Sequence, residues 1–296
     1  MIKKISLLLA MVMTFLSCIA LSSCGPEPLS DAEQAMEDFV SRLSVRKSDD
    51  GDYFVITSLG ANENSKIKAM SEYEGKPIME IGNNAFNEER AQGQLVEMIL
   101  PDSIFKIGIS SFYSCKKLTK VTLGSGMREI GFGAFQHCTS LTSINLPEGL
   151  EKIDECAFMG CSALPKFTLP STLKYIGPSA FTNTKNTGTE AFIHNESVMY
   201  MPTTDLKSWV VLAYFTVVDA DLPDNTVGIA SNAFAYCDQM TTLEIPRSVK
   251  YINKDAFVGC TSLKTIYYGG SKEEFDNIVI ESGNEKLWGA EIICAN

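Results

Sequence analysis

The sequence predicts a solenoid of stacked 23-residue repeats that contain short β-strands. Two observations support this fold class. An isoleucine precedes a phenylalanine by five residues seven times, and successive phenylalanines are 26, 23, 23, 23, 53 and 23 residues apart. Further apolar residues recur in phase after most of these phenylalanines, which is typical of a repeat array. The seven pairs are Ile81/Phe86, Ile107/Phe112, Ile130/Phe135, Ile153/Phe158, Ile176/Phe181, Ile229/Phe234 and Ile252/Phe257.

Each repeat supplies two short extended segments. Apolar residues lie nine and eleven positions after the phenylalanine, as at Ile144 and Leu146, and a spacing of two is typical of a strand. Proline follows this pair in several units and ends the strand, because it has no N–H for the ladder. A second extended segment, such as 150–153, leads into the Ala-Phe motif. One unit cannot bury so many apolar groups alone, so stacking has to form ladders of equivalent residues.

The repeat unit is x-x-Leu-x-x-Ile-x-Leu-Pro-x-x-Leu-x-x-Ile-x-x-x-Ala-Phe-x-x-Cys, and it covers roughly residues 76–268. This unit resembles the BspA-like (treponemal-type) leucine-rich repeat of bacterial surface lipoproteins. The resemblance implies a curved solenoid with short parallel β-strands on one face and turns or 3₁₀ segments on the other. It also implies a role in adhesion, because members of the family are linked to it.

The N-terminus has the features of an export signal. Lys3 and Lys4 precede an uncharged apolar run that begins at Ile5, as in the basic and apolar regions of a signal peptide. The following Leu-Ser-Ser-Cys-Gly resembles a bacterial lipobox, which implies cleavage before Cys24 and lipidation of its thiol. We therefore expect a lipoprotein signal peptide over 1–23. An ordinary signal peptide and an uncleaved anchor are the alternatives.

The rest of the chain divides into six segments. An amphipathic helix is expected after the capping box at Ser30–Glu33, and a short helix is expected to open at Ser271. The 53-residue step marks either a β-hairpin insertion or a decayed repeat. The segments are a tether (24–29), an N-terminal capping region of helix plus strand (30–75), repeats (76–181), the insertion (182–228), repeats (229–268) and a C-terminal cap (269–296).

Cysteine usage follows the repeat. Five of the nine cysteines lie three residues after a repeat phenylalanine, where a small apolar group is wanted. We expect buried free thiols, because stacked side chains point in parallel and fit disulfide geometry poorly. Disulfides remain the alternative in an exported protein, with Cys138–Cys161 as the pair best placed to form one.

Composition and motifs argue against several function classes. The formal charge of −11 is unfavourable for a nucleic-acid-binding protein, which needs a basic face. The sequence holds neither a zinc motif nor a nucleophile–base–orienter set, so we expect no enzyme, metal or cofactor. His137 beside Cys138 does not form a catalytic pair, because adjacent extended residues point apart. Asp219 and Asp221 alone are a weak calcium motif.

The remaining candidate site is the outward face of the strands. Exposed tyrosines and lysines suit contact with a protein or glycan, and tyrosine is enriched in binding hot spots. The candidate binding residues are Lys120, Thr122, Asn145, Lys166, Thr168, Tyr175, Glu244, Tyr251 and Tyr267.

We therefore predict a lipid-anchored bacterial cell-surface binding protein. Its strand face would contact a host or cell-surface protein, the matrix or a glycan. The lipid on Cys24 would be its only membrane contact. The alternative is an envelope scaffold that assists a neighbouring transport or glycan-capture system.

Overall fold

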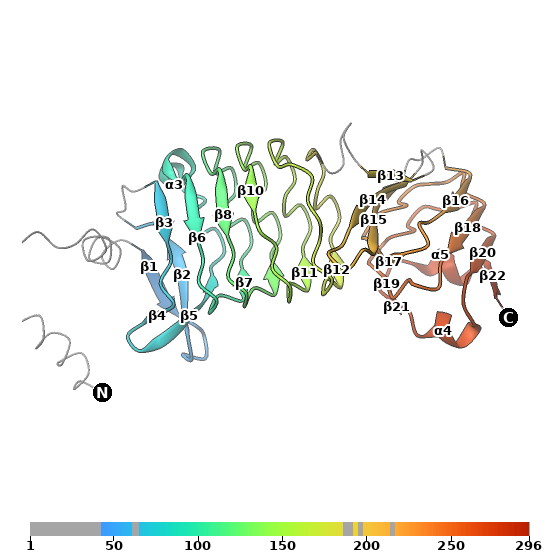
Figure 1. Ribbon diagram of the computed structural model, residues 1–296, viewed down its shortest axis with the longest axis horizontal. Coiled ribbons are helices and arrows are strands. Elements are labelled where there is room, and N and C mark those ends of the chain that lie inside the picture. The colour runs from blue at the N-terminus through green and yellow to red at the C-terminus, as the bar shows by residue number, and fades with distance from the viewer. Residues whose placement is uncertain (1–42, 61–64, 186–191, 195–197, 214–216, 296) are drawn as a thin grey trace, which may run out of the picture. The chain divides into compact units, whose positions relative to one another are not determined.

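The computed structural model describes residues 43–60, 65–185, 192–194, 198–213 and 217–295. Residues from 43 onward form one compact unit. The expected helix after Ser30 and the expected lipidation site, Cys24, lie outside the described residues. Most repeats contribute a first strand from the Ile-x-Leu segment, a second strand ending at the isoleucine of the Ile/Phe pair, and a turn. Figure 1 shows these strands in two rows along the stack, with β6, β8 and β10 in one row and β7, β11 and β12 in the other.

The first strands form two parallel sheets, which we call the first-strand sheets. The N-terminal one has the order β10-β8-β6-β3, and the C-terminal one has the order β16-β18-β20-β22. Their register keeps equivalent repeat positions side by side, as in Ile144↔Val121 and Leu243↔Ile266. The strands are β3 (Lys66–Lys68), β6 (Glu97–Ile99), β8 (Lys120–Thr122), β10 (Ser143–Ile144), β16 (Asp219–Asp221), β18 (Thr242–Ile245), β20 (Thr265–Tyr268) and β22 (Glu291–Cys294).

The second strands form two further sheets, which we call the second-strand sheets. One has the order β1-β2-β5-β7-β9-β11-β12, with β4 on β5, and the other has the order β13-β14-β15-β17-β19-β21. The strands are β1 (Ser44–Lys47), β2 (Phe54–Ser58), β4 (Glu72–Tyr73), β5 (Lys76–Ile81), β7 (Lys106–Ile107), β9 (Glu129–Ile130), β11 (Lys152–Ile153), β12 (Tyr175–Ile176), β13 (Phe192–His194), β14 (Val198–Pro202), β15 (Ser208–Ala213), β17 (Thr226–Ile229), β19 (Tyr251–Ile252) and β21 (Val279–Ile280).

The core is a ladder of phenylalanine rings, as the repeat predicts. Phe86, Phe112, Phe135, Phe158 and Phe181 stack with centroid separations of 4.8, 5.0, 5.4 and 5.7 Å. All five rings are buried. Offset stacking at these distances adds to the burial of each ring, so the ladder ties neighbouring repeats together.

The turns form a hydrogen-bonded ladder of their own. The N–H groups of Ser110, Phe112 and Ser114 donate to carbonyls of the following repeat, each at 2.8 Å. Gly133, Phe135 and His137 repeat this pattern one unit later. Ser110 and Ser114 have φ of 51° and 57°, a left-handed conformation that turns the chain twice per repeat. These segments are turns; none of the described residues forms a 3₁₀ helix.

The region 182–228 contains both a hairpin insertion and a decayed repeat, which were the two alternatives from the sequence. Strands β13, β14 and β15 pair antiparallel, which is the expected hairpin insertion with one strand more. Strand β16 instead pairs parallel with β18, in the place of a first strand. Val217, Ala220 and Leu222 are buried at the spacing of Leu-x-x-Ile-x-Leu, so this part is a decayed repeat.

Asn253 joins the two repeat arrays. Its side-chain Oδ1 accepts from the N–H of Ile176 at 3.0 Å, and its Nδ2 donates to the carbonyl of Lys174 at 3.2 Å. The N–H of Ser231 also donates to the carbonyl of Ile176 at 2.9 Å. The backbone N–H and C=O groups on the outer edge of β12 therefore form hydrogen bonds with side-chain and backbone groups of later repeats instead of with another strand.

Short helices lie where the repeat is interrupted or ends. Phe86 and Phe112 are 26 residues apart, three more than the usual repeat length. The helix α3 (Glu89–Gln94) lies in this longer unit. The helix α4 (Lys272–Asp276) begins at the expected Ser271, whose side chain forms a capping box with Glu274. Phe275 of α4 is buried and contacts the exposed Trp288 of α5 (Glu285–Trp288) edge-on.

Candidate binding face

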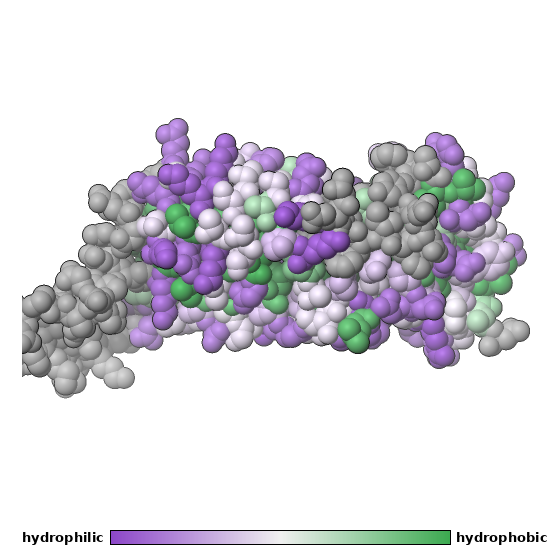
Figure 2. All heavy atoms as spheres, turned by 45° about the horizontal axis from the view of Figure 1, so that its top comes forward, coloured by the Kyte–Doolittle hydropathy of each residue, from purple (hydrophilic) through white to green (hydrophobic). Residues whose placement is uncertain are grey.

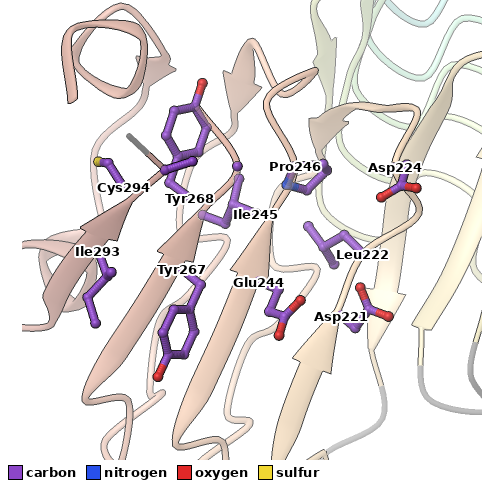
Figure 3. Close-up of a pocket in the computed structure, with 12 residues that line it drawn as sticks. Asp221, Leu222, Asp224, Glu244, Ile245, Pro246, Tyr267, Tyr268, Ile293 and Cys294 are labelled. Atoms are coloured by element: carbon purple, nitrogen blue, oxygen red, sulfur yellow. The ribbon is translucent and has the colours of Figure 1, made fainter. Parts of the chain in front are cut away.

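The C-terminal first-strand sheet carries a groove across its outward face. Asp221, Glu244, Tyr267 and Ile293 are paired in register across β16, β18, β20 and β22. Figure 3 shows these four side chains in one row. They line a hollow of about 350 Å³ together with Leu222, Asp224, Ile245, Pro246, Tyr268, Gly269, Cys294 and Ala295. We call this hollow the acidic groove.

The acidic groove has one charged end and one apolar end. Asp221, Asp224 and Glu244 are its only charged lining residues, and all three are acidic. Tyr267 and Ile293 are 45% and 41% exposed, so both present apolar surface to solvent. The carboxylate of Glu244 forms neither a hydrogen bond nor an ion pair with any described residue, so it is available to a ligand.

A cation beside the groove, Arg247, already has a carboxylate partner. Arg247 lies beside the groove in an adjoining hollow with Asp224 and Gly269. Its Nε donates to Glu274 Oε1 at 2.9 Å, and its Nη2 forms an ion pair with the same carboxylate. Hydrogen bonds from the backbone N–H of Ser271 and from Arg247 lower the pKa of Glu274, so the pair stays charged at neutral pH. Arg247 therefore does not neutralise the groove.

The N-terminal first-strand sheet presents a different surface. Lys120 forms an ion pair with Glu97 at 3.0 Å, and Lys66 contacts the same carboxylate at 3.7 Å. The pKa of Glu97 is lowered mainly by its hydrogen bond to Lys120. The Asn145 side chain bonds the N–H and carbonyl of Leu123, at 2.7 and 2.9 Å. Lys120 is therefore engaged by a neighbouring carboxylate, and Asn145 by the backbone.

Three further candidates lie on this side, one on an inner strand and two near the end of the N-terminal array. Thr122 ends β8 and is half-buried. Lys166 and Thr168 are exposed, but they precede an isolated bridge between Leu169 and Thr203 and belong to no strand. The insertion therefore interrupts the first-strand face at this repeat.

Tyr175 and Tyr251 belong to the second-strand sheets, not to the same face as Glu244 and Tyr267. Tyr251 stacks on the buried Trp209 with a centroid separation of 6.0 Å and an interplanar angle of 5°. Lys152 Nζ lies 5.6 Å from the centroid of the Tyr175 ring. Both tyrosines are half-buried, and the candidate binding residues therefore lie in two rows of strands.

The five repeat cysteines are built into the core, whereas Cys156 and Cys294 are half-buried. Each of the seven cysteines in the described residues is a thiol. The Sγ atoms of Cys138 and Cys161 donate to the carbonyls of Phe112 and Phe135, both at 3.0 Å, so the two thiols bond the backbone of the preceding repeat. Burial raises the pKa of Cys161 to about 12 and that of Cys138 well above its ordinary value. Neutral buried thiols are poor nucleophiles.

The described residues contain no group of three or more potential metal ligands. Asp219 and Asp221 lie on strand β16, not on a loop, and the Asp219 carboxylate accepts from the hydroxyls of Thr242 and Thr241. In the same part of the chain, no helix has the length and apolar composition needed to span a bilayer.

The repeat pattern matches a known family. Six copies of the BspA type leucine rich repeat region match residues 79–202 and 211–284, more than half of the chain. The chain belongs to the BspA-type leucine-rich repeat family. Solenoids of such repeats are typically scaffolds for interaction and not catalysts. A comparison with curated proteins finds no match to this BspA-type chain.

Solved structures of related fold come from several bacteria. A leucine rich cell surface protein of Faecalibacterium prausnitzii is 19% identical, with a TM-score of 0.45 over 88% of this BspA-type chain and 100% of its own. A T. pallidum leucine rich repeat protein is 22% identical, with a TM-score of 0.39 over 86% and 97% of the two chains. The pneumococcal vaccine antigen PcpA is 14% identical, with a TM-score of 0.36 over 86% and 99%.

Of the residues that line the acidic groove, the sequence pointed to Glu244 and Tyr267 and missed Asp221, Asp224 and Ile293 as binding residues. The signal for Asp221 is the buried Ala220-x-Leu222 pair followed by Pro223, which has the pattern of a first strand. Alanine in place of isoleucine concealed that repeat.

Proposed function

We propose that this chain is a lipid-anchored cell-surface protein that binds a host or cell-surface protein or glycan, as an adhesin does. The binding face is the outward side of the first strands. The observation that carries the proposal is the acidic groove, where Glu244 and the exposed Tyr267 adjoin on neighbouring strands of a rigid repeat array. A binding site placed on strands is held more precisely than one on loops.

The part of the surface that Figure 2 shows is suited to reversible contact. In the space-filling view, hydrophilic side chains dominate the visible surface and hydrophobic ones gather in small groups (Figure 2). Such a surface remains soluble without a permanent partner, whereas a large apolar patch favours obligate association. Few anchoring residues in a hollow are then expected to supply most of the binding energy.

Binding is tested with the full chain in detergent by interferometry against matrix proteins, mucins and glycans. We expect saturable binding that weakens when Glu244→Gln and Tyr267→Ala are combined. The matched control is Tyr236→Ala, because Tyr236 is also an exposed tyrosine but lies in a turn. Equal binding by the groove variant and the wild type would place the site elsewhere. Absence of binding at high micromolar concentration would favour the envelope-scaffold alternative.

The proposed anchor rests on the lipobox-like Leu-Ser-Ser-Cys-Gly around Cys24. We expect metabolic labelling with palmitate to mark the wild type and not a Cys24→Ser variant, which would move to the soluble fraction. Protease treatment of intact cells tests surface exposure. Protection of the chain until the cells are permeabilised would favour the periplasmic scaffold.

A further inference from the structure

We infer that the acidic groove binds an extended protein segment that carries arginine or lysine at one end and an apolar side chain at the other. This inference rests on the proposed function and names the chemistry of the partner. The three carboxylates of the groove lie toward β16 and β18, and the apolar Ile293 lies on β22. The groove therefore has a direction, which a segment of matching order satisfies.

Charge selects the class of partner. Asp221, Asp224 and Glu244 give the lining a formal charge of −3, with no basic side chain among the lining residues. The adjoining Arg247 is neutralised by Glu274, and the whole chain has a formal charge of −11. Complementary potentials attract a cationic segment, whereas sulfated and sialylated glycans are repelled by the same field. The guanidinium of arginine also presents several donors to paired carboxylates.

Tyr267 extends the site for a cation. Its ring stands between Glu244 on β18 and Ile293 on β22, and it is 45% exposed. A lysine or arginine stem can cover that ring while its charged head meets Glu244, because cations are attracted to aromatic faces within about 6 Å. The chain already holds one such contact, with Lys152 Nζ 5.6 Å from the centroid of the Tyr175 ring.

The length of the groove fits a short extended segment. Three strand spacings separate Asp221 from Ile293, which corresponds to roughly 14 Å. An extended chain advances about 3.3 Å per residue, so side chains four residues apart span this distance and share one face. A segment of the order Arg-Ser-Arg-Ser-Val would place its second arginine over Glu244 and its valine against Ile293, with its first arginine at the acidic end of the groove.

The probe is a fluorescein-labelled peptide with the sequence Gly-Arg-Ser-Arg-Ser-Val-Gly, measured by fluorescence anisotropy with the full chain in detergent. A peptide with glutamine in place of both arginines and a sulfated heparin fragment are the comparison probes. We expect the arginine peptide to bind at least ten-fold more tightly than either comparison probe. Its affinity should fall as sodium chloride rises, because salt screens exposed charges.

Matched variants locate the binding. Glu244→Gln and Tyr267→Ala are each expected to weaken binding of the arginine peptide by roughly three- to five-fold. The effect is modest because each lost contact with the peptide would be partly exposed to solvent. Glu273→Gln on α4 removes the same charge outside the groove and should leave binding unchanged. Equal effects of Glu244→Gln and Glu273→Gln would overturn the inference, because binding would then follow net charge alone.

The test separates this inference from the proposed function. Preferential binding of heparin, or equal binding of the arginine and glutamine peptides, would overturn the basic-segment inference even if the panel of matrix proteins shows binding. Absence of binding to the panel together with specific binding of the arginine peptide would overturn the adhesin proposal and retain the inference. Circular dichroism of each variant shows that the fold is intact.

Discussion

Phe135→Ala should strongly destabilise the repeat array. The Phe135 ring is fully buried and stacks on Phe112 and Phe158 at 5.0 and 5.4 Å, both at an interplanar angle of 8°. Truncation of a buried phenylalanine costs about 3–5 kcal/mol through lost transfer energy and the cavity left behind. Each lost ring pair adds about 0.5–1.5 kcal/mol, although neighbouring rings recover part of this by relaxation. We therefore expect a total loss of about 4–6 kcal/mol.

Urea unfolding followed by far-UV circular dichroism measures this loss. Phe135→Leu keeps most of the apolar volume and should cost about 1–2 kcal/mol, because mainly the ring stacking is lost. Phe132→Ala is the matched control, since Phe132 lies in the same turn but is 40% exposed. A loss below about 1.5 kcal/mol for Phe135→Ala, or one equal to that of Phe132→Ala, would refute the reasoning that the ring ladder holds the repeats together.

Three further predictions concern the core and the junction. The folded pKa of Cys161 is raised to about 12 by burial, so its contribution to stability is complete below the unfolded value near 9 and is lost as pH rises toward 12. Cys161→Ala should make the decline of the urea midpoint between pH 9 and 11 shallower; an unchanged slope would contradict this. Asn253→Ala should cost about 2–3 kcal/mol and accelerate hydrogen exchange of the Ile176 amide, which loses its acceptor. Exchange as slow as in the wild type would show that the junction does not depend on this side chain. Gly228→Ala should lower the thermal midpoint and alter near-UV circular dichroism, because the new Cβ would lie 2.5 Å from the Trp209 ring. An unaltered midpoint would mean that the ring moves aside freely.

The sequence predicts the repeated core well because apolar spacing and burial are directly linked. The phenylalanines, the isoleucines that precede them and the short helix that opens at Ser271 all occupy the expected positions. The phenylalanines and isoleucines depend on contacts between equivalent residues one repeat apart, which a single repeat unit already specifies. The helix start depends on residues that are neighbours in the sequence.

The candidate site is less predictable because it depends on contacts that break the repeat. Tyr251 is in phase with the other second strands, yet its ring packs on Trp209, which comes from the inserted β15. Glu244 acquires its acidic neighbour Asp221 from a decayed repeat in which alanine replaces the usual isoleucine. Neither partner can be placed from periodicity, since insertions and decayed units have no fixed register in the sequence.

The turn ladder has a consequence for how such a chain changes over evolutionary time. The turns around Phe112, Phe135, Phe158 and Phe234 each donate to their successor through the same three N–H groups, so a duplicated or deleted unit of this kind meets neighbours with the same hydrogen-bonding pattern. Gain or loss of one complete unit within 76–181 would preserve these bonds, whereas a change of a few residues requires an accommodating element such as α3. The distance between strand β5 at the start of the repeats and the acidic groove can therefore vary in steps of one strand spacing, roughly 4.8 Å, without redesign of the groove.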